Sequence, residues 1–176
     1  MAKHPSKSLL EGLSRFQKIL LITDGTVTNL LEHHLSEAMK VVKLYEGQSK
    51  YHASPQLDTK NLEGLSVLER EILLQGEKSK SNWLYAKSAI FLENLPQDFL
   101  NDLLESAQPI GKLWSKYRLE TYKRILAADK EVAGNIAKYF NIEAEDQMIS
   151  RTYSVYSNKK VIMIITEKFP FDYFQD

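Results

Sequence analysis

Two pairs of strand-length segments, each joined by a short polar turn, constrain the fold of this chain most strongly. Residues Ser66 to Gly76 and Trp83 to Leu92 are separated by six polar residues, and Gln147 to Tyr156 and Lys160 to Phe169 by three. Apolar, β-branched and aromatic residues dominate all four segments, as they do in strands. Because a short turn can join only antiparallel neighbours, we predict two β-hairpins in an antiparallel sheet.

Helical periodicity occupies much of the chain between and before the hairpins. Amphipathic patterns predict helices over residues 8–16, 30–35, 96–104, 113–119 and 131–140. Thr26 or Thr28 can cap the second of these, and Pro96 opens the third. Strand pairs interrupted by helices are typical of the α+β class, so we predict a single antiparallel β-sheet flanked by helices. Since a domain averages roughly 150 residues, residues 1–176 are expected to form one domain.

Two segments are harder to assign from the sequence. Residues 39–45 predict a strand, but residues 46–65 turn polar, with two glycines and one proline. A stretch of this length without periodicity is long for a connection, and we interpret it as a flap or an excursion. Residues 120–127 fit a strand and a helix equally well.

The composition excludes several classes of function. The 23 basic and 23 acidic side chains cancel, which argues against a nucleic-acid-binding protein. The absence of cysteine excludes a disulfide scaffold, a thiolate metal site and a cysteine nucleophile. His4, His33, His34 and His52 lack metalloenzyme spacing, so we expect no metal. The longest apolar run, residues 161–165, is far shorter than the roughly 20 residues of a membrane span, and no signal peptide is evident. We expect a cytoplasmic protein.

The phase of two predicted strands singles out Arg70 and Glu167. Alternate residues of a strand face opposite sides, and each of these charges is the only one on an otherwise apolar face. A buried charge costs several kcal/mol unless it is paired. A guanidinium on a cavity wall binds a carboxylate in a bidentate manner, and a carboxyl group in an apolar setting suits hydrogen bonding or proton transfer at an oxygen. The two residues therefore predict a closed pocket for a small anion that carries a hydroxyl or ether oxygen.

Simpler interpretations stay open at this level. Either charge could be solvated at a strand end, or belong to a structural ion pair. For Arg151, which shares its phase with Tyr153, an ion pair at the rim of the sheet is the favoured interpretation. Residues 24–28 could present backbone amides to an anion, although a simple turn and helix cap explain them equally well. The aromatic residues near Trp114 are interpreted as helix packing.

An ordered set of motifs resembles one known family. These motifs are LLITDGTVTNLLE at 20–32, LEREILL at 68–74, QPIGK at 108–112, RTY at 151–153 and ITEKFP at 165–170. The set is similar to the chorismate lyase superfamily (chorismate pyruvate-lyase, or 4-hydroxybenzoate synthase), and in particular to its short stand-alone branch. The resemblance extends over nearly the whole chain.

The resemblance implies a ligand enclosed between the sheet and helical flaps, and it implies that the flap over residues 46–65 is one of the lids of the site. Members of the family cleave chorismate to 4-hydroxybenzoate and pyruvate without a metal or organic cofactor. By motif, Arg70 matches the arginine that grips the ring carboxylate, and Glu167 matches the glutamate at the 4-oxygen of the ring. Val27 and Ile110 match two positions whose backbone amides contact the ligand.

The resemblance does not identify the partner of the second, enolpyruvyl carboxylate of chorismate, for which Arg151 and Lys112 are candidates. It implies a cofactor-independent carbon–oxygen lyase, which we expect to be a monomer. In a cyanobacterial setting its product would enter plastoquinone synthesis, and elsewhere another quinone or an aromatic glycolipid route. The alternatives are a non-catalytic sensor or carrier for small aromatic acids with the same fold, and a structural protein with a buried ion pair.

Overall fold

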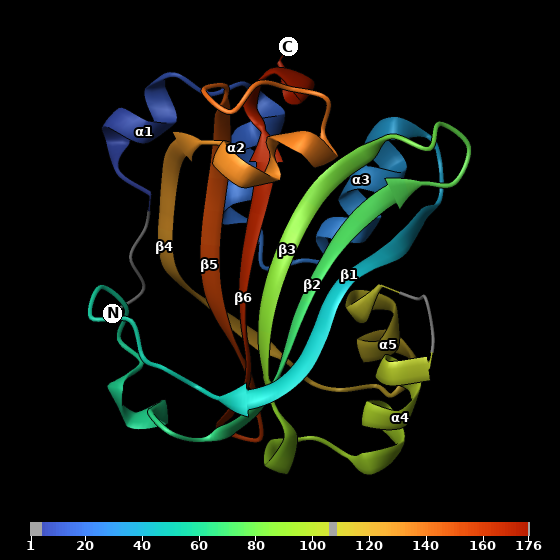
Figure 1. Ribbon diagram of the computed structural model, residues 1–176, viewed down its shortest axis with the longest axis vertical. Coiled ribbons are helices and arrows are strands. Elements are labelled where there is room, and N and C mark those ends of the chain that lie inside the picture. Colours follow the sequence, from blue (N-terminus) through green and yellow to red (C-terminus); the bar gives the residue numbers. More distant parts are fainter. Residues whose placement is uncertain (1–4, 106–108, 176) are drawn as a thin grey trace.

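The computed structural model describes residues 5–105 and 109–175, and its centre is a six-stranded antiparallel sheet (Figure 1). The order across the sheet is β1-β2-β3-β6-β5-β4. The strands are β1 (Met39–Lys50), β2 (Ser66–Gly76), β3 (Asn82–Phe91), β4 (Tyr122–Val132), β5 (Gln147–Ser157) and β6 (Lys160–Pro170). Both predicted hairpins form, as β2–β3 and β5–β6, and the predicted fold class is confirmed.

Short helices connect and cover the strands. The α-helices are α1 (Lys7–Glu11), α2 (Arg15–Ile22), α3 (Val27–Leu35), α4 (Gln97–Glu105) and α5 (Ile110–Lys116). The 3-10 helices are η1 (Lys60–Leu62), η2 (Leu92–Asn94), η3 (Gly134–Tyr139) and η4 (Phe171–Phe174). Within the described part of the chain, no helix is both long and apolar enough to cross a membrane.

One face of the sheet is covered by α2, α3, α4 and α5. Leu21 of α2 and Leu31 of α3 are fully buried in a core that includes Leu84 of β3. Leu103 of α4 and Leu113 of α5 are likewise buried in a second core on this face. The two helix pairs thus cover separate parts of the same face.

The opposite face is covered by η3 and by the segment between β1 and β2. Phe140 packs with Leu73 of β2 in one core, and Tyr51 and Leu62 pack with Phe91 of β3 in another. The prediction of a lid over residues 46–65 is therefore wrong. Residues up to Lys50 extend β1. Residues 51–65 bury their few apolar side chains against this face of the sheet. The segment is mostly polar, so its composition did not indicate this packing.

Three predicted helices also differ from the structure. The helix expected over 113–119 begins three residues earlier, as α5 at Ile110, and ends at Lys116. The helix expected over 8–16 is two helices, because Ser14 starts a new one: its hydroxyl accepts from the Gln17 amide at 3.1 Å, and the Gln17 side chain accepts from the Ser14 amide at 2.8 Å. The helix expected over 131–140 is the end of β4 followed by η3. Gly134, with φ of 55°, is the first residue of η3 and turns the chain after β4.

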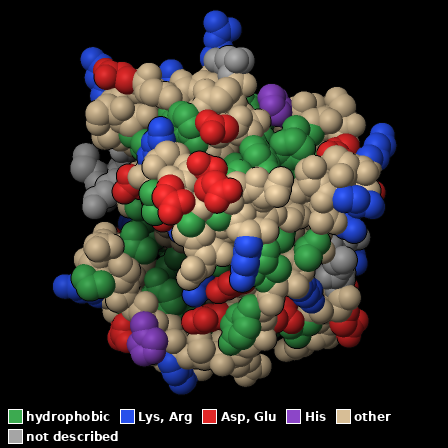
Figure 2. Space-filling model, turned by 45° about the horizontal axis from the view of Figure 1, so that its top comes forward, with side chains coloured by type: hydrophobic (Ala, Val, Ile, Leu, Met, Phe, Trp, Pro, Cys, Tyr) green, Lys and Arg blue, Asp and Glu red, His purple; other side chains and the backbone are tan. Residues whose placement is uncertain are grey.

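Basic and acidic side chains are both spread over the surface view in Figure 2, in keeping with the formal net charge of zero. The described residues contain no cluster of three side chains that could ligate a metal ion.

Candidate active site

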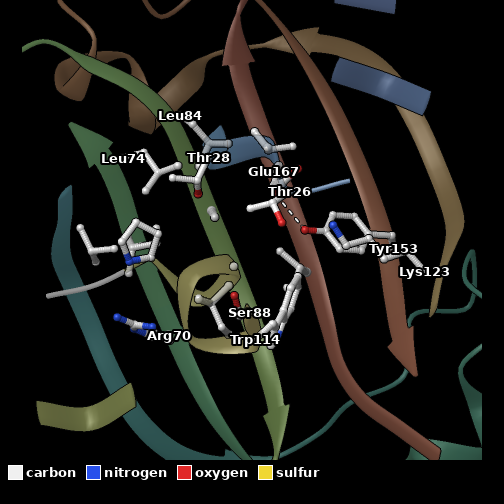
Figure 3. Close-up of a pocket in the computed structure, with 18 residues that line it drawn as sticks. Thr26, Thr28, Arg70, Leu74, Leu84, Ser88, Trp114, Lys123, Tyr153 and Glu167 are labelled. Carbon is white, nitrogen blue, oxygen red and sulfur yellow. Dashed lines mark hydrogen bonds between the residues drawn. The ribbon is translucent and has the colours of Figure 1, made fainter. Parts of the chain in front are cut away.

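A cavity lies between the sheet and the first turns of α3 and α5 (Figure 3). The strands contribute a mostly apolar wall, and the helix starts contribute Thr26, Val27, Pro109 and Ile110. The space free of protein atoms is about 570 Å³ when the part open to solvent is included, which is in the range of small-molecule sites.

Arg70, on β2, is the cation at one side of the cavity. Its side chain is almost fully buried, and its Nε lies 3.5 Å from Oε2 of Glu46, too far for a hydrogen bond. Within the residues that the structure describes, Nε and Nη2 of Arg70 find no hydrogen-bond acceptor. Burial lowers the pKa of the guanidinium, and the charge of Glu46 opposes this change. A buried guanidinium with unused donors is suited to an anionic ligand.

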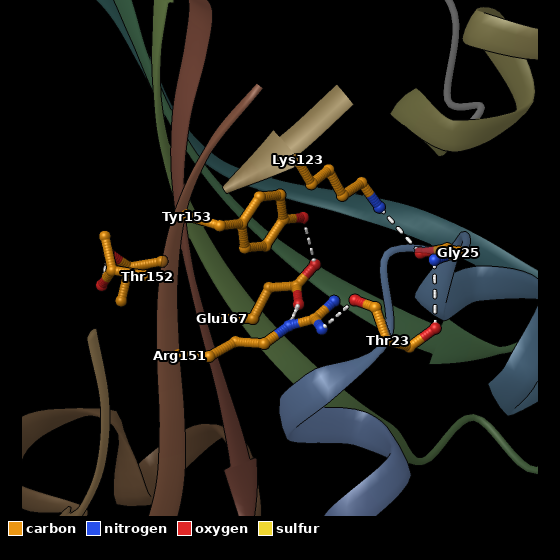
Figure 4. A network of polar contacts seen from close by, with 8 residues as sticks. Thr23, Gly25, Lys123, Arg151, Thr152, Tyr153 and Glu167 are labelled. Carbon is orange, nitrogen blue, oxygen red and sulfur yellow. Dashed lines mark hydrogen bonds and ion pairs between the residues drawn. The ribbon is translucent and has the colours of Figure 1, made fainter. Parts of the chain in front are cut away.

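Glu167, on β6, lies on the same cavity wall and forms the centre of a buried polar cluster (Figure 4). Its Oε2 accepts a hydrogen bond from Nε of Arg151 at 2.7 Å, and its Oε1 accepts one from the Tyr153 hydroxyl at 2.8 Å. Burial and the charge of Glu167 raise the pKa of Tyr153 well above its ordinary value. Each carboxylate oxygen can accept a further hydrogen bond from a ligand, because each has a second lone pair.

Arg151 forms an ion pair, as the sequence favoured, but the pair is buried and not at the rim of the sheet. Only 1% of Arg151 is exposed, and its Nη1 donates to the Thr23 carbonyl at 2.8 Å in addition to the bond with Glu167. Burial lowers its pKa, but the charge of Glu167, the nearby Tyr153 and the hydrogen bonds to these two groups together outweigh burial, so the pKa is raised. Arg151 is Cα-paired with Glu167 across β5 and β6, so it stands behind the carboxylate and does not line the cavity.

Lys123, on β4, is a further cavity residue that the sequence analysis did not identify. Its Nζ donates to the Gly25 carbonyl at 2.7 Å, and lies 5.1 Å and 5.2 Å from the ring centroids of Trp114 and Tyr153. Burial lowers the pKa of Lys123 to about 8, against the opposing charge of Glu167. In the sequence, residues 120–127 fit a strand and a helix equally well. The alternation of side chains along a strand could therefore not be used to predict which way Lys123 points.

The structure brings all four residues of the predicted site, Val27, Arg70, Ile110 and Glu167, to this one cavity. Val27 and Ile110 are the first residues of α3 and α5, and the N–H groups of a first helical turn have no acceptor within the helix. Lys112 lies elsewhere: its Nζ is 2.8 Å from Glu32 and it does not line the cavity. Trp114, which was interpreted as packing, packs and also lines the cavity.

Gly111 allows the starts of α3 and α5 to meet. A Cβ atom at this position would overlap the Cγ2 methyl group of Thr26. The side chain of Thr26 makes no capping hydrogen bond, so its methyl group can be removed without loss of a cap. The spacing of the two helix starts, and with it the width of the cavity, therefore depends on glycine at 111.

We expect Gly111→Ala to lower the free energy of unfolding by about 1–3 kcal/mol, because the added methyl group forces the helix starts apart. Thr26→Ser removes the Cγ2 atom that would be overlapped, and should restore most of that loss in the double variant. Urea denaturation of the four proteins of this cycle measures both effects. An additive double variant would show that the two positions are not in contact.

Comparisons with known proteins identify related sequences. A family model described as chorismate pyruvate-lyase Rv2949c-like matches residues 21–175. The sequence is 29% identical to a chorismate pyruvate-lyase of Mycobacterium leprae (strain TN), over 97% of this chain and 81% of the relative.

Solved structures with a similar fold include two domains of low sequence identity. The effector domain of PhnF from Mycobacterium smegmatis superimposes with a TM-score of 0.65 at 12% identity, over 86% of this chain and 92% of that chain. The C-terminal domain of the histidine utilization repressor from Pseudomonas syringae pv. tomato gives a TM-score of 0.57 at 14% identity, over 78% and 95% respectively. At such identities the likeness extends to the fold alone.

Proposed function

This chain belongs to the Rv2949c-like chorismate pyruvate-lyase family, and on that premise we propose that it eliminates pyruvate from chorismate and releases 4-hydroxybenzoate. One observation carries the proposal. A buried arginine with unused donors and a buried glutamate with room for a further hydrogen bond line the same apolar cavity. A ring with a carboxylate at one end and an oxygen at the other, as in 4-hydroxybenzoate, is complementary to that arrangement.

The two residues have distinct positions in the sheet. Arg70 is Cα-paired with Ser88 on β3, and Glu167 is Cα-paired with Ala86 on the same strand. At ordinary strand spacings the two Cα atoms are therefore about 12 Å apart. Both side chains line the cavity, so a ring that enters it can contact one of them at each end. We assign Arg70 to the ring carboxylate and Glu167 to the 4-oxygen.

The elimination needs no redox partner. The C4–H bond and the bond from C3 to the ether oxygen break, and the electrons of the C–H bond complete the aromatic ring. The enolpyruvyl group leaves with its oxygen and gains a proton at its methylene carbon, which gives pyruvate. The proton lost from C4 of the ring balances the proton gained by the methylene carbon of the enolpyruvyl group.

The cavity would accelerate this step mainly by position and by electrostatics. Arg70 holds the ring by its carboxylate, and Glu167 accepts a hydrogen bond from the 4-hydroxyl group, which fixes the orientation of C4 and C3. The amides of Val27 and Ile110 add donors at the helix starts. Apolar walls keep water from the ring and strengthen each of these interactions.

We further propose that residues 1–176 act as one domain and as a monomer, without a cofactor. The product would serve quinone synthesis, such as that of plastoquinone.

The decisive experiment is to incubate the purified protein with chorismate and to quantify 4-hydroxybenzoate by chromatography. A reaction without protein corrects for the slow spontaneous decay of chorismate to the same product. Formation of 4-hydroxybenzoate and pyruvate in equal amounts above that background is expected. A wild-type protein that binds 4-hydroxybenzoate, raising its melting temperature, but forms no product would be a carrier or sensor and not a lyase.

Glu167→Gln is expected to lower kcat by about 100-fold, because the amide replaces the anionic acceptor at the 4-oxygen. The amide retains the shape of the side chain and can keep a hydrogen bond to Tyr153, but it leaves the buried Arg151 without its counter-charge and should also lower stability. Steady-state kinetics at a temperature at which the melting curve shows the variant to be folded separates the effect on kcat from unfolding. Unchanged kcat would contradict the assignment of Glu167.

A further inference from the structure

Lys123 is one of two cations that line the cavity within residues 5–105 and 109–175, the other being Arg70. The two lie on opposite sides of the cavity, with Glu167 between them (Figure 3). Chorismate has two carboxylates, of which the proposed function gives only the ring carboxylate a partner. Lys123 is therefore a cation without an assigned role, in a cavity whose proposed ligand has a second carboxylate without an assigned partner.

The charges of the site favour a dianion. Arg151 hydrogen-bonds Glu167 at 2.7 Å, so this buried pair is neutral as a unit. Arg70 and Lys123 are then the two positive groups left on the cavity wall, although Glu46 partly offsets Arg70 at 3.5 Å. 4-Hydroxybenzoate needs one of these cations, whereas chorismate, with two carboxylates, can use both.

The position of Lys123 fits the chemistry of the substrate. The enolpyruvyl group is attached to C3, next to the C4 carbon whose oxygen is assigned to Glu167. Its partner must therefore lie close to Glu167. Lys123 is opposite Val155 in the β4–β5 register. Val155 is two residues from Tyr153 along β5, and the hydroxyl group of Tyr153 donates to Glu167. Arg151 is also close, but it does not line the cavity.

The ammonium group is held in place and has donors to spare. It uses one N–H on the Gly25 carbonyl at 2.7 Å, and the rings of Trp114 and Tyr153 flank it. No other protein acceptor of Lys123 is found among the described residues, so two of its three N–H groups are available to a carboxylate. A backbone carbonyl is neutral, and an anionic acceptor would bind these donors more strongly.

We propose that Lys123 is the substrate-specificity residue that binds the enolpyruvyl carboxylate of chorismate. This inference rests on the proposed function, since it names the partner of one group of that substrate. It distinguishes substrate from product, because 4-hydroxybenzoate lacks the enolpyruvyl group. Lys123 should thus contribute to binding chorismate and not to binding 4-hydroxybenzoate.

The test compares Lys123→Met with wild type for both molecules. We expect kcat/KM for chorismate to fall by about 30-fold or more, as for loss of one partner of a desolvated charge pair. The Kd of 4-hydroxybenzoate, measured by calorimetry, should change less than threefold. Lys123→Arg keeps the charge and should recover much of kcat/KM. Lys130→Met, on the same strand and outside the cavity, is the matched control and should resemble wild type.

The possible outcomes separate this inference from the proposed function. Wild type that forms no product contradicts the proposed function. Wild type that turns over chorismate, with Lys123→Met equal to it in kcat/KM, contradicts the inference alone. Equal weakening of chorismate and 4-hydroxybenzoate also overturns it, because Lys123 would then act on the shared ring or on the fold. If Lys123→Met does not fold, Lys123→Gln provides the same comparison.

The pH dependence supplies a second readout. Glu167 on β6, Arg151 and Tyr153 on β5, and Asp24 before α3 surround the Lys123 ammonium group, whose pKa is lowered to about 8. The group is charged below this pH and neutral above it, so kcat/KM for chorismate should fall as the pH rises through about 8. Lys123→Arg should remain active to a higher pH. If kcat/KM fell at the same pH in wild type and in Lys123→Arg, the titrating group would not be Lys123.

Discussion

Arg70→Ala is expected to lower kcat/KM for chorismate by about 1,000-fold or more and to abolish detectable binding of 4-hydroxybenzoate. Arg70 is 3% exposed, and its Nε and Nη2 have no acceptor within the described residues. Alanine would leave the ring carboxylate in an apolar cavity without a counter-charge at that side. Chorismate and 4-hydroxybenzoate both carry this carboxylate, so the binding of both should be weakened. The Lys123 variants, in contrast, should weaken the binding of chorismate alone.

Arg70→Lys makes the comparison sharper. Lysine keeps the charge but cannot form the two parallel hydrogen bonds of a guanidinium, so we expect it to recover only part of the loss. Arg124→Ala removes an arginine of β4 that pairs with Asp58 at 3.2 Å and lies outside the cavity, and it should leave turnover unchanged. Product formation by chromatography and calorimetric titration of 4-hydroxybenzoate measure these effects. Full activity in Arg70→Ala would refute its assignment.

The second large effect concerns stability. Arg151→Met is expected to reduce the free energy of unfolding by about 3–5 kcal/mol, because it leaves the buried carboxylate of Glu167 without its cation. The Arg151 side chain is fully buried, and its Nη1 also binds the Thr23 carbonyl. Methionine retains the volume of the aliphatic part of the side chain and lacks the charged guanidinium group. Turnover should also fall, since Glu167 loses the residue that orients it.

A double variant tests whether the uncompensated charge causes this loss. Arg151→Met combined with Glu167→Gln contains no buried charge at the pair, and we expect it to regain a large part of the lost stability while it stays catalytically impaired. Urea denaturation of wild type, both single variants and the double variant gives the coupling energy. A double variant as unstable as the sum of the single variants would mean that Arg151 contributes mainly through packing and its bond to Thr23.

The periodicity of single strands was informative because it is a local property. Arg70 shares a sheet face with Ile72 and Leu74, and the three residues line the cavity together. Glu167 shares the cavity face of β6 with Ile165 in the same way. Alternation along a strand follows from backbone geometry alone. It could therefore be used to predict which charges point inward before any strand had been paired with another.

The partner of Glu167 could not be predicted in that way. Counted from the β5–β6 turn, where Ser157 pairs with Lys160, Arg151 would be opposite Thr166. A bulge between Val155 and Tyr156 shifts the register by one residue and pairs Arg151 with Glu167 instead. The ion pair thus depends on one extra residue in a ladder, and the rim position expected for Arg151 was wrong for that reason.

The segments at residues 46–65 and around Lys123 show a second limit. Polarity suggested a flap, and the family resemblance a lid, but Tyr51 and Leu62 bury the 46–65 segment on the face opposite the cavity. Lys123 lies in a segment that fitted a strand and a helix equally, and pairing with β5 made it a strand. Which face of the sheet a connection covers, and whether an ambiguous segment becomes a strand, both depend on contacts with distant residues.

The sequence by itself determined the hairpins, the helix that carries Leu30, Leu31 and Leu35, the two charges that face inward and, through its ordered motifs, the family. These properties depend on turn chemistry, periodicity and residue identity, which are local. The tertiary structure alone decided that Arg151 neutralises Glu167, that Lys123 is the second cation of the cavity, and that α3 and α5 meet at Gly111. Each of these depends on strand register or on close packing between segments far apart in the chain, which no local pattern specifies.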